Sequence, residues 1–159
     1  MNNLPIINDR SCQNCTKCCE GYLAGDIRGK YMGMLPDKTI QPCFFVNIGK
    51  GCNDYDNRPI DPCRTFKCDY LTNPDIPDSF KPSRSNAIFT TRTINGVQYT
   101  KIIEAGRKLD SEVLSWAISY ALVNEINLAW TVLDNIFWVG SEEFNIMMEK
   151  DYPLLNTHV

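Results

Sequence analysis

The chain has 159 residues, a length typical of a single domain, and its hydrophobic content of 43% with 22% charged residues indicates a globular protein. The net charge of −3 excludes a general electrostatic attraction to nucleic-acid phosphates or to anionic lipid. The longest apolar runs span only a few residues, so no transmembrane segment is expected. Residues 1–10 contain neither a basic segment nor a long apolar run, so we expect no signal peptide and predict a cytoplasmic location.

The N-terminal part of the chain is rich in turn-forming residues. Residues 12–82 contain thirteen glycines and prolines, whereas residues 83–159 contain four. Apolar residues in this part follow neither the helical nor the strand period, so little apolar surface is available to offset an ordering entropy of about 1–2 kcal/mol per residue. We therefore predict an irregular module over 1–82 and a second domain over 83–159, packed as one compact unit. The proline-rich stretch 73–82 is expected to connect these two parts.

The second domain begins with a strong β-hairpin pattern. Two segments rich in β-branched and aromatic residues, 87–94 and 97–104, flank Asn95-Gly96. This dipeptide accepts the positive φ angles of a type I′ turn, the turn that joins two strands most directly. An apolar segment then predicts a helix that begins at Asp110 or Ser111 and ends near Asn124.

The same patterns return near the C-terminus. Segments 128–133 and 136–139 predict a second hairpin across Asp134-Asn135. Ser141, followed by two glutamates, predicts the start of a short helix that ends near Lys150, before a proline. The expected order is therefore ββαββα: an α+β fold with a small antiparallel sheet, two helices on one face, and the cysteine-rich module packed against it.

Cysteines are the most informative residues of the N-terminal part. All eight fall within residues 12–68, and no secretion signal accompanies them, so metal ligands or redox thiols are favoured over disulfides. We take all of them as candidate metal ligands: Cys12, Cys15, Cys18, Cys19, Cys43, Cys52, Cys63 and Cys68.

The spacing leaves two kinds of metal centre open. A Cys-x2-Cys pair is the turn found in many tetrahedral zinc sites, whereas three cysteines at this spacing also suit iron or a [4Fe-4S] cluster. Cys18 and Cys19 are adjacent, and neighbouring side chains of an extended chain point in opposite directions. The two sulfurs should therefore serve two centres, unless one of them binds no metal, and eight thiolates divide naturally into two sites of four.

Basic residues close to the cysteines can neutralise the negative charge of thiolate centres. Arg58 and Arg64 lie between or beside cysteines in the sequence, and we expect them to donate hydrogen bonds to the sulfurs. The only histidine is the penultimate residue, His158, which makes histidine-based acid–base catalysis a poor explanation of the chain.

Over residues 10–70 the sequence resembles a known family. Cys12-x2-Cys15-x2-Cys18-Cys19 is followed by Cys43-Phe44-Phe45, Gly51-Cys52-x2-Tyr55-x2-Arg58-Pro59 and Cys63-Arg64-x-Phe66-x-Cys68. This order is similar to that of the CxxCxxCC cysteine-cluster family, described as zinc- or iron-chelating proteins. The resemblance implies metal chelation at the eight cysteines and implies no particular reaction.

Together these patterns predict a cytoplasmic metal-binding protein. Thiolate-ligated zinc, or alternatively iron, would hold the N-terminal module and support the binding of a protein or peptide partner. The alternative is an iron–sulfur enzyme or accessory protein that acts on a peptide or protein substrate. Residues 1–82 contain ten basic and ten acidic side chains, which disfavours nucleic acid as a partner.

Overall fold

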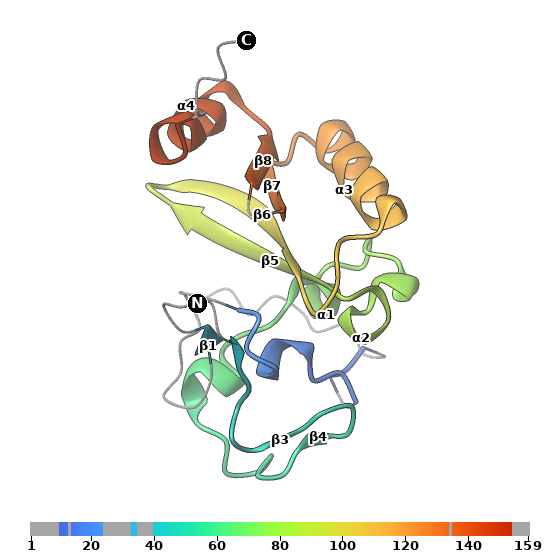
Figure 1. Cartoon of the computed structure of the whole chain (residues 1–159). Helices are drawn as coiled ribbons and strands as arrows, with labels where there is room; N and C mark the ends of the chain where they lie inside the picture. Colours follow the sequence, from blue (N-terminus) through green and yellow to red (C-terminus); the bar gives the residue numbers. More distant parts are fainter. Residues whose placement is uncertain (1–9, 13, 24–32, 35–39, 134, 154–159) are drawn as a thin grey trace.

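The computed structural model describes residues 10–12, 14–23, 33–34, 40–133 and 135–153, and shows a mixed α+β fold (Figure 1). The expectations for the N-terminal nine residues, for Asp134 and for His158 lie outside the described residues. The elements are η1 (Lys17–Cys19), β1 (Gly33–Met34), β2 (Ile40–Gln41), β3 (Val46–Asn47), β4 (Gly51–Cys52), η2 (Ile60–Arg64), α1 (Asp69–Thr72), η3 (Asp78–Phe80), α2 (Pro82–Ser85), β5 (Ala87–Ile94), β6 (Val97–Glu104), α3 (Ser111–Val123), β7 (Leu128–Val132), β8 (Asn135–Val139) and α4 (Glu142–Asp151).

The first hairpin is confirmed with the expected bounds. β5 and β6 pair antiparallel in a register that places Ile94 opposite Val97, and Asn95 and Gly96 have φ angles of 51° and 83°. Both helices of the second domain are also confirmed. The Ser141 hydroxyl accepts a hydrogen bond of 3.2 Å from the Phe144 N–H and so caps α4, whereas Asp110 precedes α3 without a side-chain cap.

The prediction of an antiparallel sheet was wrong, because the sheet is mixed. Its strand order is β5-β6-β7-β8, and β6 pairs with β7 in parallel, with Ile102 opposite Trp130. The reason is the intervening helix α3. A helical crossover returns the chain to the same end of the sheet, so the next strand runs in the same direction as the strand before the helix.

The expectation that both helices cover one face was also wrong. Alternate residues of a strand point to opposite faces. In β7, Leu128 belongs to the apolar cluster that contains α3, whereas its neighbour Ala129 packs in a second cluster with Phe144 and Met148 of α4. The two helices therefore cover opposite faces of the sheet, as their positions on either side of β7 and β8 in Figure 1 show.

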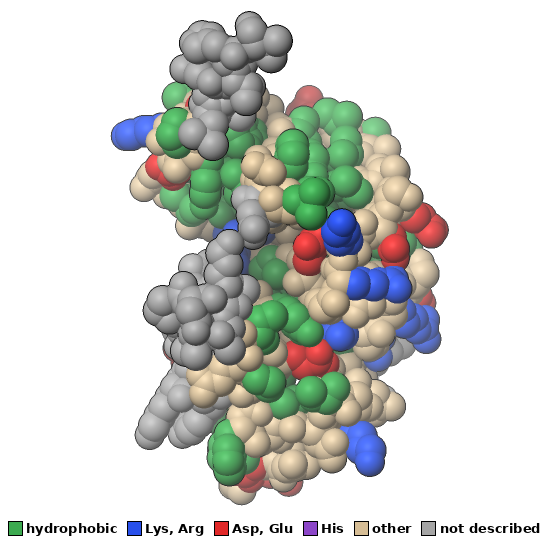
Figure 2. Space-filling model, viewed as in Figure 1, with side chains coloured by type: hydrophobic (Ala, Val, Ile, Leu, Met, Phe, Trp, Pro, Cys, Tyr) green, Lys and Arg blue, Asp and Glu red, His purple; other side chains and the backbone are tan. Residues whose placement is uncertain are grey.

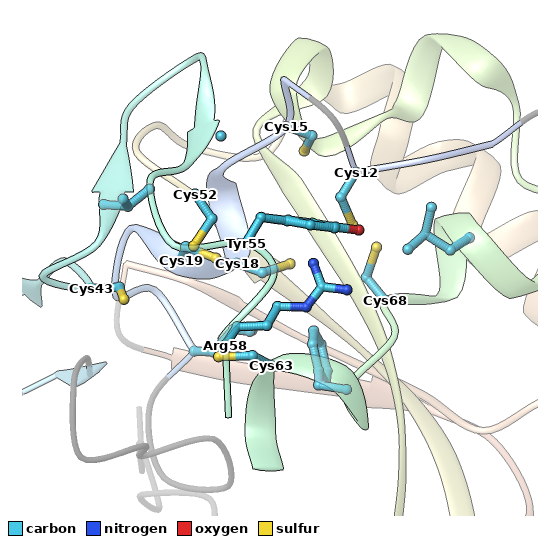
Figure 3. A pocket seen from close by; sticks show the side chains of 15 residues that line it. Cys12, Cys15, Cys18, Cys19, Cys43, Cys52, Tyr55, Arg58, Cys63 and Cys68 are labelled. Atoms are coloured by element: carbon cyan, nitrogen blue, oxygen red, sulfur yellow. The ribbon is translucent and has the colours of Figure 1, made fainter. Parts of the chain in front are cut away.

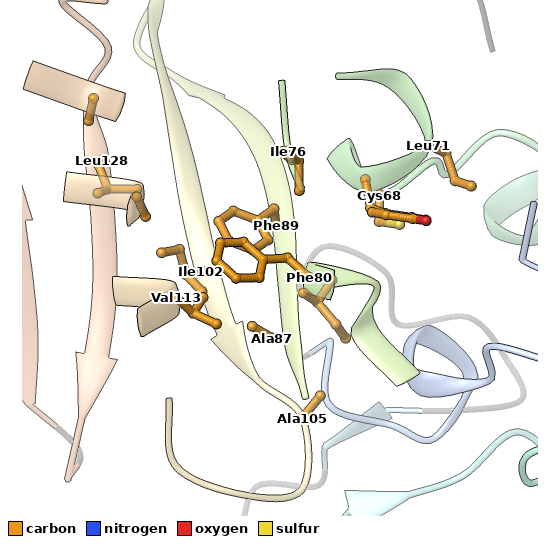
Figure 4. Close-up of a cluster of buried hydrophobic side chains, with 14 of the residues drawn as sticks. Cys68, Leu71, Ile76, Phe80, Ala87, Phe89, Ile102, Ala105, Val113 and Leu128 are labelled. Carbon is orange, nitrogen blue, oxygen red and sulfur yellow. The ribbon is translucent and has the colours of Figure 1, made fainter. Parts of the chain in front are cut away.

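The larger cluster joins the N-terminal part of the chain to the sheet (Figure 4). The rings of Phe80, Phe89 and Trp116 contact one another, with centroid distances of 6.5 Å for Phe80–Phe89, 6.1 Å for Phe89–Trp116 and 5.5 Å for Phe80–Trp116. The connecting stretch 73–82 contributes to this core, since its residues Ile76 and Phe80 are only 2% and 4% exposed. Among the described residues, no helix is long and apolar enough to cross a membrane.

Buried Asp69 adds a polar link between the two parts. Its carboxylate accepts hydrogen bonds from the Thr91 N–H (3.0 Å) and the Thr91 hydroxyl (2.9 Å), which ties α1 to β5. Asp69 directly follows Cys68 in the sequence. The apolar core and this link together place the cysteine-bearing loops against one end of β5.

Candidate metal centre

One cavity of about 130 Å³ is lined by all eight cysteines of the chain (Figure 3). They come from segments up to 56 positions apart in the sequence, and none is joined to another by a disulfide. Tyr55 and Arg58 also line the cavity, and its remaining wall is mostly apolar, with side chains that include Leu23, Phe66 and Leu71. The structure thus brings together every predicted ligand.

The segment that contains the first four cysteines is held by local hydrogen bonds. The Cys15 N–H donates to the Cys12 carbonyl, and the Cys19 N–H donates to the Thr16 carbonyl at 2.8 Å, so two successive tight turns present the sulfurs. Thr16 is 4% exposed; its hydroxyl donates to the Glu20 carboxylate at 2.7 Å and accepts from the Gly49 N–H at 3.0 Å. These polar contacts fix the segment without an apolar core of its own.

Two short hairpin strands position the next two cysteines. The Cys43 N–H donates to the Cys19 carbonyl at 2.8 Å, and the Val46 N–H donates to the Cys43 carbonyl at 3.1 Å. In the pairing of β3 with β4, Val46 lies opposite Cys52. Cys43 and Cys52 are therefore brought beside Cys19 by main-chain hydrogen bonds.

The last two cysteines sit on short helical segments. Cys63 belongs to η2, and the Thr65 N–H donates to the Ile60 carbonyl at 3.0 Å at the end of this turn. Cys68 immediately precedes α1, and its side chain is one of the buried members of the main core. The Leu71 N–H donates to the Cys68 carbonyl at 2.9 Å, and the main-chain N–H groups of Leu71 and Tyr70 act to lower the pKa of the Cys68 thiol.

Burial and mutual repulsion make ionisation of these thiols unfavourable. Burial raises the pKa of the Cys12 thiol to about 11, and the charges of Cys68 and Cys15 act in the same direction. Burial likewise raises the pKa of Cys19 to about 12, with the charges of Cys43 and Cys63 as further causes. At neutral pH these two side chains are thus neutral thiols, and a cation among them would favour the thiolates.

Cys18 and Cys68 form a hydrogen-bonded thiol pair. The Cys18 thiol donates a hydrogen bond to the Cys68 sulfur. This hydrogen bond is the main reason that the pKa of Cys18 is raised well above its usual value and that the pKa of Cys68 is lowered. The proton therefore resides on Cys18, and Cys68 is the member of the pair that ionises more readily.

Arg58 contributes a cation to the cavity. Its guanidinium lies 3.5 Å from the centroid of the Tyr55 ring, and its positive charge opposes the rise in the pKa of Cys63. The Nε atom of Arg58 is buried and, alone among the buried side-chain nitrogen and oxygen atoms that the structure describes, has no hydrogen-bond partner. A buried donor without a partner costs about 1–3 kcal/mol, so this N–H group is suited to a negatively charged acceptor in the cavity.

Arg64 does not line the cavity. It is exposed, and its Nε and Nη2 atoms donate to the main-chain oxygens of Arg58 (3.1 Å) and Asp56 (2.7 Å). Arg64 therefore supports the loop that presents Arg58, and its hydrogen bonds go to main-chain oxygen rather than to sulfur.

Sequence reasoning missed the position of Tyr55 over Arg58 and the buried pair of Thr16 with Glu20. The spacing Tyr55-x2-Arg58 was a usable signal, because it brings an aromatic ring and a cation together across one turn. For Thr16 and Glu20 no signal was present, since polar residues beside cysteines are ordinary at the surface. Their burial depends on the loop around Gly49, which lies 33 positions away from Thr16.

The donor set fits a metal that prefers sulfur, although the sulfurs do not surround one point. Within the described ranges, no three His, Cys, Asp or Glu side chains are already arranged to hold one metal ion. A Zn–S bond is about 2.3 Å long, so ligation requires the thiols to turn toward a common centre. Eight sulfurs and one unpartnered N–H donor suit zinc or iron, whereas magnesium and calcium require oxygen ligands.

No protein-family model, curated protein or solved structure matches this chain. The resemblance to the CxxCxxCC cysteine-cluster family therefore remains a prediction that rests on the motif alone.

Proposed function

We propose that this protein binds metal ions through its eight cysteine thiolates, and that the bound metal holds the N-terminal module in shape. The observation that carries the proposal is that all eight cysteines line one cavity. The unpartnered Nε–H of Arg58 adds a donor of the kind that thiolate centres use. We place zinc first and iron, including an iron–sulfur cluster, second.

The metal would compensate for the scarcity of apolar burial in the loops around the cavity. Several apolar side chains there are exposed, among them Phe44 at 84% and Ile60 at 70%. Figure 2 shows hydrophobic side chains at the surface of the lower part of the molecule, where β3 and β4 lie. Structural zinc contributes apparent binding free energies of about 10–16 kcal/mol, which is ample to order a segment of this size. We further propose that these exposed apolar side chains support the binding of a protein or peptide partner in the cytoplasm.

Metal quantification on the anaerobically purified full-length chain tests the proposal. We expect roughly two zinc ions per chain and a colourless protein if zinc is the physiological metal. A brown protein with acid-labile sulfide would also support thiolate metal binding, and would favour the alternative of an iron–sulfur enzyme or accessory protein. A chain that stays free of zinc and iron after expression in metal-supplemented medium would refute the proposal.

Matched variants relate the metal to structure. We expect Cys15→Ser and Cys63→Ser each to bind less metal than the natural chain and to become sensitive to protease in the N-terminal module. Asn53→Ser is the control, because Asn53 is exposed and neighbours Cys52 in the sequence. Unchanged metal content and protease resistance in both cysteine variants would contradict the proposal.

A further inference from the structure

The eight thiols do not contribute equally to one cluster, because the chain holds adjacent Cys18 and Cys19 in different surroundings. Both belong to the single turn η1, in which consecutive side chains are rotated by about 120°. The Cys18 thiol donates to the Cys68 sulfur, whereas the Cys19 carbonyl accepts from the Cys43 N–H. One residue thus faces the start of α1 and the other faces the segment that leads into β3.

Three further observations place Cys12 and Cys15 on the side of Cys18 and Cys68, although the charge of Cys12 also acts on Cys19. A main-chain hydrogen bond closes the turn between Cys12 and Cys15. Cys12 and Cys15 are also the sulfur neighbours whose charges act on Cys18 besides Cys68. In Figure 3 the side chains of Cys12 and Cys68 lie on the same side of the cavity, beside the end of the Arg58 side chain.

Three of the other four cysteines are connected through β3, β4 and the segment that leads into them, and Cys63 of η2 joins them through its sulfur neighbours. The Cys43 N–H donates a hydrogen bond to the Cys19 carbonyl. The Val46 N–H donates to the Cys43 carbonyl, and Val46 lies opposite Cys52 in the pairing of β3 with β4. The sulfur neighbours whose charges act on Cys63 are Cys43 and Cys52. In Figure 3 the Cys19 and Cys52 side chains lie together, on the side away from Cys68.

Arg58 lies between these two sets. Its guanidinium is covered by the Tyr55 ring at 3.5 Å, which fixes the direction of the side chain, and its Nε–H has no acceptor within the protein atoms described. Figure 3 shows the side chain running from beside Cys63 toward Cys12 and Cys68. Two tetrathiolate centres of a divalent ion carry a total charge of about −4, so a cation between them reduces their mutual repulsion.

We propose that the cavity holds two separate four-sulfur centres and that Arg58 is a positioning residue shared by both. The first centre is formed by Cys12, Cys15, Cys18 and Cys68. The second is formed by Cys19, Cys43, Cys52 and Cys63. This inference rests on the proposed function and adds to it the division of the ligands. On binding, each ligating thiol gives its proton to solvent and its sulfur lone pair to the ion, without a change in oxidation state.

Cobalt(II) binding to the chelator-treated, reduced full-length chain tests the division, because thiolate-bound cobalt is coloured and can be counted by titration. We expect two ions for the natural chain, and one ion for Cys15→Ser, for Cys52→Ser and for the double variant Cys15→Ser/Cys18→Ser. The double variant Cys15→Ser/Cys52→Ser, with one change in each set, is expected to bind none tightly. Loss of both ions in Cys15→Ser/Cys18→Ser would overturn the division.

Alkylation of the free thiols, followed by mass spectrometry, gives a second readout that does not depend on all variants folding. With one ion bound to Cys52→Ser, we expect protection of the four cysteines of the first centre and full alkylation of Cys19, Cys43 and Cys63. Protection of a mixed set would overturn the division while leaving metal binding intact. Absence of any bound ion in the natural chain would instead refute the proposed function, and the division with it.

The role of Arg58 is tested by Arg58→Gln and Arg58→Lys, with Arg107→Gln as the control. Arg107 forms an exposed ion pair with Asp110, and its side chain is 53% exposed. We expect Arg58→Gln to keep two ions but to lose about 10–100-fold in affinity, the range found for residues that support metal ligands. Arg58→Lys should recover part of this loss through its charge. Equal affinity of Arg58→Gln and the control would overturn the role of Arg58.

Discussion

Arg10 provides the most direct test of how the cysteine-bearing segment is attached to the rest of the protein. Its Nη1 atom donates to the carbonyls of Tyr70 and Asn73, both at 2.9 Å, and its Nη2 atom donates to the Ile76 carbonyl at 2.7 Å. The guanidinium also lies 4.5 Å from the centroid of the Tyr70 ring, and its side chain is 10% exposed. One side chain thus ties the start of the first cysteine turn to the segment after Cys68.

The loss in free energy of unfolding that we expect when Arg10 is replaced follows from these contacts. Hydrogen bonds from a charged donor contribute about 1.5–3 kcal/mol each, but three bonds from one side chain are not additive. The ion pair with Asp78 adds less than about 1 kcal/mol, because the Asp78 side chain is 74% exposed. We therefore expect Arg10→Ala to lower the free energy of unfolding by about 3 kcal/mol, which is more than one such hydrogen bond contributes and less than the sum of three.

Urea unfolding followed by tryptophan fluorescence, with a chelator present, measures this loss without a contribution from bound metal. Arg10→Lys should lose most of the same free energy, because one ammonium group does not reproduce the planar fork of the guanidinium. Arg107→Ala is the matched control and should change the free energy of unfolding by less than about 1 kcal/mol. If Arg10→Ala and Arg107→Ala have equal stability, the attachment does not depend on these hydrogen bonds.

Further predictions concern the core, the link to β5 and the thiols. Phe89→Ala should lower the free energy of unfolding by about 3–5 kcal/mol, because the ring is 2% exposed, and a loss below 1 kcal/mol would contradict its place in the core. Asp69→Ala should cost about 1–3 kcal/mol, because two donors of Thr91 lose their acceptor; a neutral result would rule this link out. Metal affinity should rise from pH 6 to pH 8, because the pKa values of about 11 and 12 at Cys12 and Cys19 mean that a metal must displace protons. A chelator competition series measures this affinity, and no dependence on pH would be the contrary result.

The sequence was most informative where the signal is local. Asn95-Gly96 specified the first turn, because few other residues adopt the positive φ angles that this turn requires. Ser141 marked the start of α4 for a similar reason, since its hydroxyl accepts a main-chain N–H of the first turn. Each of these features depends on residues within a few positions of one another.

The errors concerned relations between elements. The parallel pairing of β6 with β7 depends on how α3 packs against the sheet, where its Trp116 contacts Phe89 of β5, and no short stretch of sequence contains both residues. The placement of α3 and α4 on opposite faces has the same origin. Trp130 and Ala129 are both apolar, so the sequence does not show which face each helix covers.

The same distinction holds at the candidate site. By itself, the sequence determined which atoms are available: eight thiols in turn-rich loops, with arginines close by. Only the tertiary structure decided that these thiols share one cavity, that Arg58 is inside it, and that Arg64 instead holds the neighbouring main chain. The physical reason is that side-chain chemistry belongs to each residue, whereas proximity arises from hydrogen bonds and apolar contacts between residues far apart in the chain.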